Sequence, residues 1–281
     1  MKTKRWNTAA LIALMMGLLC LSACKSKEQK AAEAAQLEYE DMVDNCRDKI
    51  KKADEPEKLK KIKEKLVDVA DFDEMYGRVM PEVYCKAGEL QKQFDKKVEN
   101  LKQDFMKMAD AYIEDNDYFD AMQTVAALSE IDENSGEELK KLVREWAPMM
   151  GYIRVTDVEY ANCEKDASDI EPVGTTLHSD KMRYLYPRLT FDSMLPEERP
   201  AADTRVQVKI FNPDGTLKTG SDSPNGYTYA SDIKVDPAMK NQKKWLKGYG
   251  NATTSCYPAG TYKVEFYIRG ILIYRNEVEI H

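Results

Sequence analysis

The chain has 281 residues, of which 32% are charged, and its formal net charge is −7. This length is sufficient for two domains. The acidic balance excludes the broad positive surface of a general nucleic-acid binder, so we expect no nucleic acid among its partners. Residues 25–148 alone carry 22 lysines and arginines against 31 aspartates and glutamates, which indicates a well-solvated acidic surface.

The first residues have the layout of a secretory signal peptide. Lys2, Lys4 and Arg5 make a positive start, an apolar run covers 9–21, and the chain then changes to the polar stretch KSKEQK. The apolar run is shorter than the roughly 20 residues that a spanning helix needs. We predict a leader at 1–23, a tether at 24–30, and no membrane-spanning helix later in the chain.

The leader ends in Leu21-Ser22-Ala23-Cys24. This stretch resembles the lipobox of bacterial lipoproteins. The resemblance implies that Cys24 becomes the first residue of the mature protein and carries acyl chains such as palmitate, and two or three such chains hold a protein firmly to a membrane. Lys25 takes a place where Asp would favour retention at the inner membrane, so we expect the outer membrane. The choice between its periplasmic face and the cell surface stays open.

Apolar residues recur at steps of three and four between 31 and 148. The clearest run consists of Leu90, Phe94, Val98, Leu101, Phe105, Met108 and Tyr112. This spacing predicts helices with one apolar stripe each. Breaks are expected at 54–56, 77–81 and 115–117, and Ser135 with Glu138 fits a capping box for the last helix. We predict a helical bundle or hairpin domain over 31–148, with a coiled coil to a partner as the alternative.

After Pro148 the apolar pattern changes to a period of two. The expected strands are 152–158, 182–191, 206–211, 227–235, 261–268 and 271–280. Turn-forming stretches lie between them, at 212–215 and 223–226. Many short strands of this kind predict an antiparallel β-sandwich over 151–281. The predicted fold class is therefore multi-domain, α followed by β.

The C-terminal stretch PAGTYKVEFYIRGILIYRNEVEI resembles the closing hairpin of immunoglobulin-like sandwich modules in exported bacterial proteins. Pro258, Gly260 and Tyr262 open its first strand. The segment 152–281 also resembles the C-terminal domains of uncharacterised lipoproteins from Gram-negative gut anaerobes. These resemblances imply an immunoglobulin-like fold, and they imply no activity, because such modules support many functions.

Four cysteines remain after the leader and the lipidated Cys24. They are Cys46, Cys85, Cys163 and Cys256. Export permits disulfides, and because two cysteines fall in each half, Cys46–Cys85 and Cys163–Cys256 are the economical pairings. The sequence does not determine the connectivity. No Cys or His spacing indicates a metal, and we expect no cofactor.

Catalytic motifs are missing from the sequence. The two histidines, His178 and His281, have no partner at metal-ligand spacing, and neither an HExxH motif nor a GxSxG elbow occurs. Carboxylates are so numerous that a pair meeting by chance is uninformative. We therefore expect a protein that is not an enzyme.

Aromatic residues gather in the turn-rich part of the sandwich, at Tyr227, Tyr229, Trp245, Tyr249 and Tyr257. One interpretation is that they pack into the core and cover sheet edges. The other is that Trp245 and Tyr249 form an exposed platform that stacks on sugar rings. In the same domain Asp192-Ser193-Met194 matches the acceptor pattern of an O-glycosylation system in these bacteria, with Ser193 as the acceptor.

Together these features predict a lipid-anchored envelope protein that acts as an interaction or spacer module with another envelope protein. The alternative is a carbohydrate- or polymer-binding lipoprotein that uses the loop aromatics. A third interpretation, an inhibitor or chaperone with a helical groove, has no sequence feature that separates it from the first.

Overall fold

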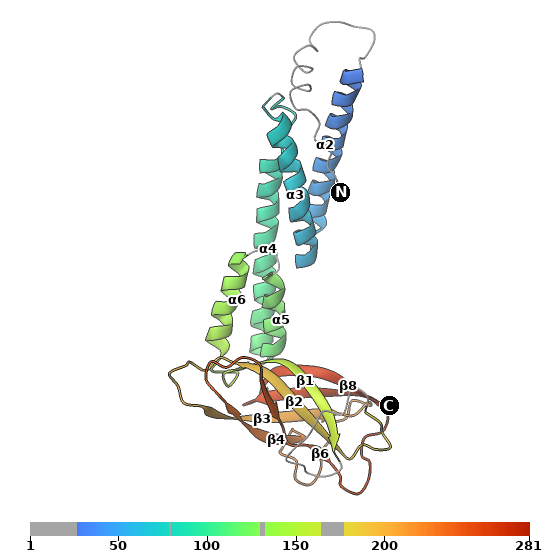
Figure 1. Cartoon of the computed structure of the whole chain (residues 1–281), viewed down its shortest axis with the longest axis vertical. Helices are drawn as coiled ribbons and strands as arrows, with labels where there is room; N and C mark the ends of the chain where they lie inside the picture. The colour runs from blue at the N-terminus through green and yellow to red at the C-terminus, as the bar shows by residue number, and fades with distance from the viewer. Residues whose placement is uncertain (1–26, 79, 130–132, 164–176) are drawn as a thin grey trace. The chain divides into compact units, whose positions relative to one another are not determined.

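The computed structural model describes residues 27–78, 80–129, 133–163 and 177–281. They divide into two compact units. The helical unit contains the described residues up to Phe105 together with 127–135, and the composite unit contains 106–126 and 136–281. The order of elements, helices followed by antiparallel strands, confirms the predicted fold class (Figure 1).

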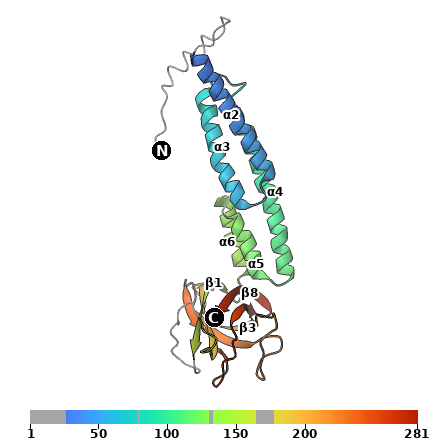
Figure 2. The ribbon, with the colours of Figure 1, turned by 90° about the vertical axis from the view of Figure 1, so that its right-hand side faces the viewer.

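Three helices build the helical unit. Helices α2 (Lys27–Lys52) and α3 (Pro56–Tyr76) and the first part of α4 (Ala87–Glu114) lie side by side in both views (Figures 1 and 2). Each buries one stripe, as the spacing predicts. The buried side chains are Tyr39, Val43, Cys46, Ile50, Leu59, Ile62, Leu66, Val69, Leu90, Phe94 and Leu101.

The predicted break at 54–56 is confirmed. Glu55 is extended, with φ −132° and ψ 145°, and Pro56 occupies the start of α3. Proline suits this position because its fixed φ is helical and because the first N–H groups of a helix lack an internal partner.

A hydrogen-bond network stabilises the connection between α3 and α4. The Tyr39 hydroxyl donates to Oδ1 of Asp73 at 2.5 Å and accepts from the Lys86 N–H at 3.0 Å. Oδ2 of Asp73 accepts from the Ala87 N–H at 2.8 Å. Burial, followed by the bond to Asp73, raises the pKa of Tyr39. One tyrosine therefore joins α2, α3 and the start of α4.

The composite unit holds most of helices α5 (Tyr118–Leu128) and α6 (Glu133–Trp146). The capping-box prediction is wrong, because α6 begins at Glu133 and Ser135 lies inside the helix. Within residues 27–78, 80–129, 133–163 and 177–281, no helix has the length and apolar character needed to cross a membrane.

Two antiparallel sheets form the sandwich. The first contains β1 (Ile153–Cys163), β2 (Tyr184–Ser193), β5 (Gln242–Trp245) and β6 (Tyr249–Gly250). The second runs in the order β4 (Tyr229–Val235), β3 (Ala202–Phe211), β7 (Gly260–Ile268) and β8 (Ile271–Ile280). All six expected strands are present: 271–280 coincides with β8, and the other five differ from the prediction at one or both ends. Strands β5 and β6 were not expected, because each is short and forms by pairing with β2.

The helices of the composite unit share the core of the sandwich. Tyr118 and Trp146 meet edge to face, with their ring centroids 5.9 Å apart, and both belong to the same buried cluster as Leu189, Val208 and Phe266. The compact units therefore do not follow the change of sequence pattern at 148. The second half of the helical pattern belongs with the strands.

Hydrogen bonds and close packing join these helices to the second sheet. At α5, the Leu272 N–H of β8 donates to the Asn116 carbonyl at 2.9 Å. The turn after α6 places Gly151 at φ +63°. A Cβ added there would lie 3.0 Å from side-chain atoms of Ile268 and Thr204. Thr204 also donates to the Gly151 carbonyl at 3.3 Å. A side chain at Gly151 would strain this turn.

Candidate functional site

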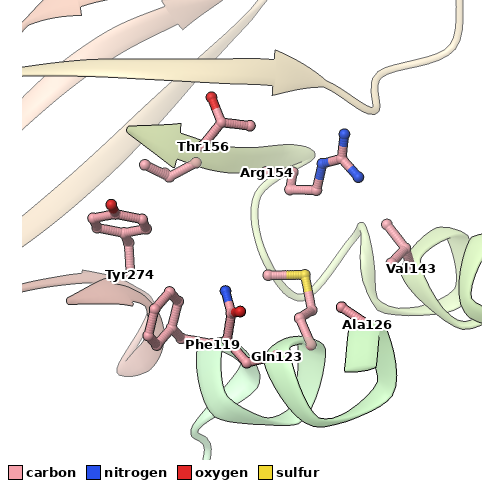
Figure 3. A pocket seen from close by; sticks show the side chains of 9 residues that line it. Phe119, Gln123, Ala126, Val143, Arg154, Thr156 and Tyr274 are labelled. Atoms are coloured by element: carbon pink, nitrogen blue, oxygen red, sulfur yellow. The ribbon is translucent and has the colours of Figure 1, made fainter. Parts of the chain in front are cut away.

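A cavity of about 440 Å³ lies where α5 and α6 meet strands β1 and β8 of the composite unit (Figure 3). Helix α5 contributes four of the lining residues, α6 one, β1 three and β8 one. The lining consists of Phe119, Met122, Gln123, Ala126, Val143, Arg154, Val155, Thr156 and Tyr274. Strands β1 and β8 are edge strands of their sheets. The cavity therefore lies between the two helices and one edge of the sandwich.

A β-bulge shapes the β1 wall. The register with β2 shifts between Val155 and Asp157, which leaves Thr156 without an opposite residue. Its hydroxyl donates to the Thr190 carbonyl at 3.1 Å. A bulge increases the local twist and redirects side chains, and such irregularities occur often beside functional sites.

Arg154 brings a positive charge to the same wall. Its guanidinium donates to Asp192 at 2.6 Å, and the Asn241 N–H also donates to this carboxylate at 3.0 Å. Burial would raise the pKa of Asp192, but the bonds from Arg154 and Asn241 outweigh it and hold the pKa below its usual value. The Arg154 side chain remains 46% exposed, so its other N–H groups stay accessible to a ligand.

The opposite wall is aromatic and rests on an ionic support. Phe119 and Tyr274 meet edge to face at 5.2 Å, and their rings come from α5 and β8 (Figure 3). Burial raises the pKa of Tyr274. Next to these rings Arg275 pairs with Asp120 and lies 3.6 Å from Asp117. These contacts hold α5 against the edge of β8.

The lining suits recognition of an amphipathic group. Met122 and Val155 are buried at the apolar side, whereas Gln123 and Arg154 are exposed and offer N–H donors. The nine lining residues include no histidine, cysteine or carboxylate. Apolar lining with a few polar groups is typical of a binding pocket. An apolar moiety that carries an acceptor or a negative charge matches these groups.

The two proposed platform residues do not lie together. Trp245 is opposite Arg188, and the Arg188 guanidinium lies 5.1 Å from its ring centroid. Tyr249 is opposite the buried Leu185. Because side chains alternate along β2, positions 185 and 188 face opposite sides of the sheet. Trp245 therefore faces outward and Tyr249 faces the core, where it stacks on Tyr229 at 6.1 Å.

The remaining aromatics of this region are engaged by the fold. Tyr257 is fully buried, and its hydroxyl donates to the Tyr249 carbonyl at 2.7 Å. Tyr227 contacts Tyr267 edge to face, and the Lys209 ammonium lies over both rings. The interpretation that these rings pack into the core and over its edges describes most of them.

Cys46, Cys85 and Cys256 are free thiols in the structure. The predicted Cys46–Cys85 bond is therefore not formed. Cys46 is buried on the apolar stripe of α2, whereas Cys85 is exposed. Burial raises the pKa of both Cys46 and Cys256. Because Cys256 is also a free thiol, the predicted Cys163–Cys256 bond is not formed either.

The proposed modification sites remain predictions. Ser193 ends β2 half-buried, and its hydroxyl accepts the Leu195 N–H at 3.2 Å. Its neighbour Asp192 is held by Arg154 and Asn241. Cys24 lies outside the described residues.

Sequence reasoning missed the cavity and its residues. They come from four elements that are distant in the chain, and a bulge leaves no pattern that a period of two can reveal. Phe119 and Tyr274 are ordinary aromatic positions of a helix and a strand until β8 is placed beside α5.

Comparison with known proteins adds no assignment. No family model and no curated protein matches the chain. Among solved structures, an immunoglobulin-like protein from Pseudomonas aeruginosa is 13% identical, and the match covers 46% of this chain and 96% of that one at a TM-score of 0.26.

Two further solved structures match with similarly low scores. The alkylpurine DNA glycosylase AlkC from Pseudomonas fluorescens is 9% identical over 72% of this chain and 53% of its own, with a TM-score of 0.27. A β-glucosidase from Kluyveromyces marxianus is 14% identical over 45% and 14%, with a TM-score of 0.24. Scores this low carry no argument about function.

Proposed function

We propose that this protein is a lipid-anchored protein of the bacterial outer membrane that acts by binding another envelope protein and not by catalysis. The cavity between α5, α6, β1 and β8 is the observation that carries the proposal. Its walls are held in place by the Arg275 pairs and by the shared core. Such preorganisation lowers the cost of binding.

The two parts of the chain have different roles in this proposal. The leader pattern that ends in Cys24 supplies the membrane attachment, and most of the helical unit follows it in the sequence, before the binding unit. Helix α2 alone has 26 residues, which corresponds to about 39 Å of helix. The binding site is the cavity, with Arg154 and Gln123 as its donors.

The anchor is tested by metabolic labelling with a palmitate analogue in the source cells. We expect label on the wild-type protein, no label on Cys24→Ser, and unchanged label on Cys85→Ser, which alters an exposed cysteine elsewhere. Label that persists in Cys24→Ser would contradict lipidation at this residue.

The binding role is tested by site-specific photocrosslinking in living cells. A photoreactive residue in place of Gln123 reports on the mouth of the cavity, and one in place of the exposed Ser221 is the matched control in the same unit. We expect a reproducible envelope-protein adduct from position 123 and not from position 221. Equal adducts at both positions, or a hydrolase activity that one carboxylate substitution abolishes, would overturn the proposal.

The glycan-binding alternative has weaker support. Its two stacking residues lie on opposite faces of the sheet, so at most Trp245 can contribute a ring to an outward site. If it binds glycans there, Trp245→Ala abolishes retention on a glycan column, whereas Tyr227→Ala does not. Retention that is unchanged by Trp245→Ala rejects this alternative.

A further inference from the structure

A second hollow lies in the helical unit and shares no lining residue with the cavity described above. The end of α2 and the start of α3 enclose a groove of about 390 Å³. Its floor is apolar, because Ala53 and Ile62 are 1% and 3% exposed. Its rim carries five lysines, which are Lys49, Lys52, Lys58, Lys61 and Lys65.

Much of this positive charge is not neutralised. Lys58 lies 2.5 Å from Asp54, and Lys61 lies 2.7 Å from Glu57. In the described part of the chain, the other three rim lysines make no ion pair. Lys49 and Lys65 line the same groove, and the Lys65 side chain lowers the pKa of Lys49. A concentrated positive site thus occurs in a protein whose net charge is −7.

Helix stability does not explain this arrangement. Cations near the end of α2 favour the helix dipole, which accounts for Lys49 and Lys52. A cation in the first turn opposes the dipole, and Lys58 lies in the first turn of α3. Lysine stems cover apolar surface well, but coverage does not require five ammonium groups around one opening.

We propose that this groove binds an acidic amphipathic helix of a protein partner. Lys58, Lys61 and Lys65 recur at steps of three and four, so they follow one side of α3. Carboxylates at the same steps on a partner helix would face them. An apolar side chain between those carboxylates would reach Ile62. This is the helix-in-groove mode of recognition, with charge complementarity setting partner choice.

Two observations favour a protein helix over an anionic membrane. Lys49 comes 22 residues after Lys27, so about 33 Å of helix lies between the groove and the start of α2, which is the end that follows Cys24 in the sequence. All five cations are lysines, and none supplies the planar fork with which arginine grips phosphate. The inference does not depend on the proposed cavity, since the two sites share no residue.

The test uses the full lipidated protein in detergent and a fluorescein-labelled synthetic helix with a leucine stripe flanked by glutamates. Binding is followed by anisotropy. We expect saturable binding that weakens as salt rises, because exposed charges are screened. Lys49→Glu with Lys65→Glu should weaken it about tenfold or more. Lys49→Ala with Lys65→Ala should weaken binding by a smaller factor. This variant replaces the charge-reversal variant if the latter does not fold.

The matched control is Lys60→Glu with Lys63→Glu. Both lysines are exposed on α3 outside the groove, and the pair changes the net charge by the same amount. We expect the affinity of this control to change less than about threefold. Equal loss in the two reversal variants overturns the inference, because general electrostatics would then explain binding. Equal binding of a scrambled peptide of the same composition overturns it as well.

Two other possible occupants of the groove, a membrane and a second copy of this chain, would each give a different experimental result. Phosphatidylglycerol vesicles that bind through the rim lysines, without binding of the peptide, would assign the groove to a membrane. Self-association in sedimentation that Lys49→Glu with Lys65→Glu abolishes would assign it to a second copy of this chain. Either result overturns the proposal of a partner helix.

Discussion

The helical unit and the composite unit use apolar side chains in different ways. In the helical unit each helix buries one stripe on its neighbours, and a hydrogen-bond network at Tyr39 stabilises the connection between α3 and α4. In the composite unit two sheets and parts of three helices share one core. A narrow stripe can be recognised from its period, whereas a shared core depends on which elements meet.

The largest expected effect tests whether the core of the composite unit is shared. Trp146→Ala removes a ring that packs on Tyr118 inside the cluster formed with the strands. We expect a loss of about 3–5 kcal/mol and faster hydrogen exchange in β1 and β8 as well as in α6. Leu66→Ala, a buried change in the helical unit, should leave exchange in the strands unchanged. Faster exchange confined to α6 would contradict a common core.

The next effect concerns the ionic support of α5. Arg275→Ala leaves Asp117 and Asp120, whose side chains are 16% and 21% exposed, without their cation. We expect a loss of about 1.5–3 kcal/mol in urea unfolding, together with loss of the adduct at position 123. The control is Arg205→Ala, whose pair with Asp232 is 3.5 Å long and exposed, and it should cost less than about 1 kcal/mol. Similar losses would show that α5 does not depend on this support.

The third effect tests the hydrogen bonds of Tyr39 in the helical unit. Tyr39→Phe deletes the hydroxyl that donates to Asp73 and accepts from the Lys86 N–H. We expect a loss of about 1–2 kcal/mol, measured by urea unfolding of this unit. Tyr76→Phe alters a ring of the same aromatic cluster, for which the described residues show no hydroxyl bond, and it should be nearly neutral. Equal effects would show that the network contributes nothing beyond packing.

The smallest effect is a pH dependence at the cavity wall. The folded pKa of Asp192 lies below its unfolded value of about 3.9, so its stabilising contribution is present above that pH and is lost as the pH falls through the folded pKa. We expect Asp192→Asn to lower stability at neutral pH by less than about 1 kcal/mol. The difference from wild type should shrink as the pH falls below about 3.9 and vanish once the pH lies below the folded pKa of Asp192. A difference that persists in acid would indicate lost packing instead of lost charge.

The elements themselves were largely predictable. The break before Pro56 and the stripe through Leu90 and Phe94 follow from local chemistry, and the structure has both. Strands β5 and β6 were not predictable because they consist of four and two residues and depend on pairing with β2. The start of α6 was misplaced by three residues, because a cap at Ser135 would begin the helix at 136 whereas it begins at Glu133.

The candidate site was much less predictable. Trp245 and Tyr249 are close in the chain, and a strand register that was not evident from the residues places them on opposite faces. The cavity residues show the converse, because Phe119 and Tyr274 are 155 positions apart and touch in the folded chain. The lysine groove combines the end of one helix with the start of the next, so its parts were visible while their convergence was not.

By itself the sequence determined the leader pattern at Cys24, the helical and extended segments, and the face that each segment buries. Period, turn residues and proline act over a few residues, and a sequence contains them directly. The tertiary structure alone decided that α5 and α6 share a core with the strands, where the cavity opens, and which aromatic rings face outward. Those outcomes depend on strand register and on which apolar faces pair, and many pairings satisfy the same local pattern until the whole chain is packed.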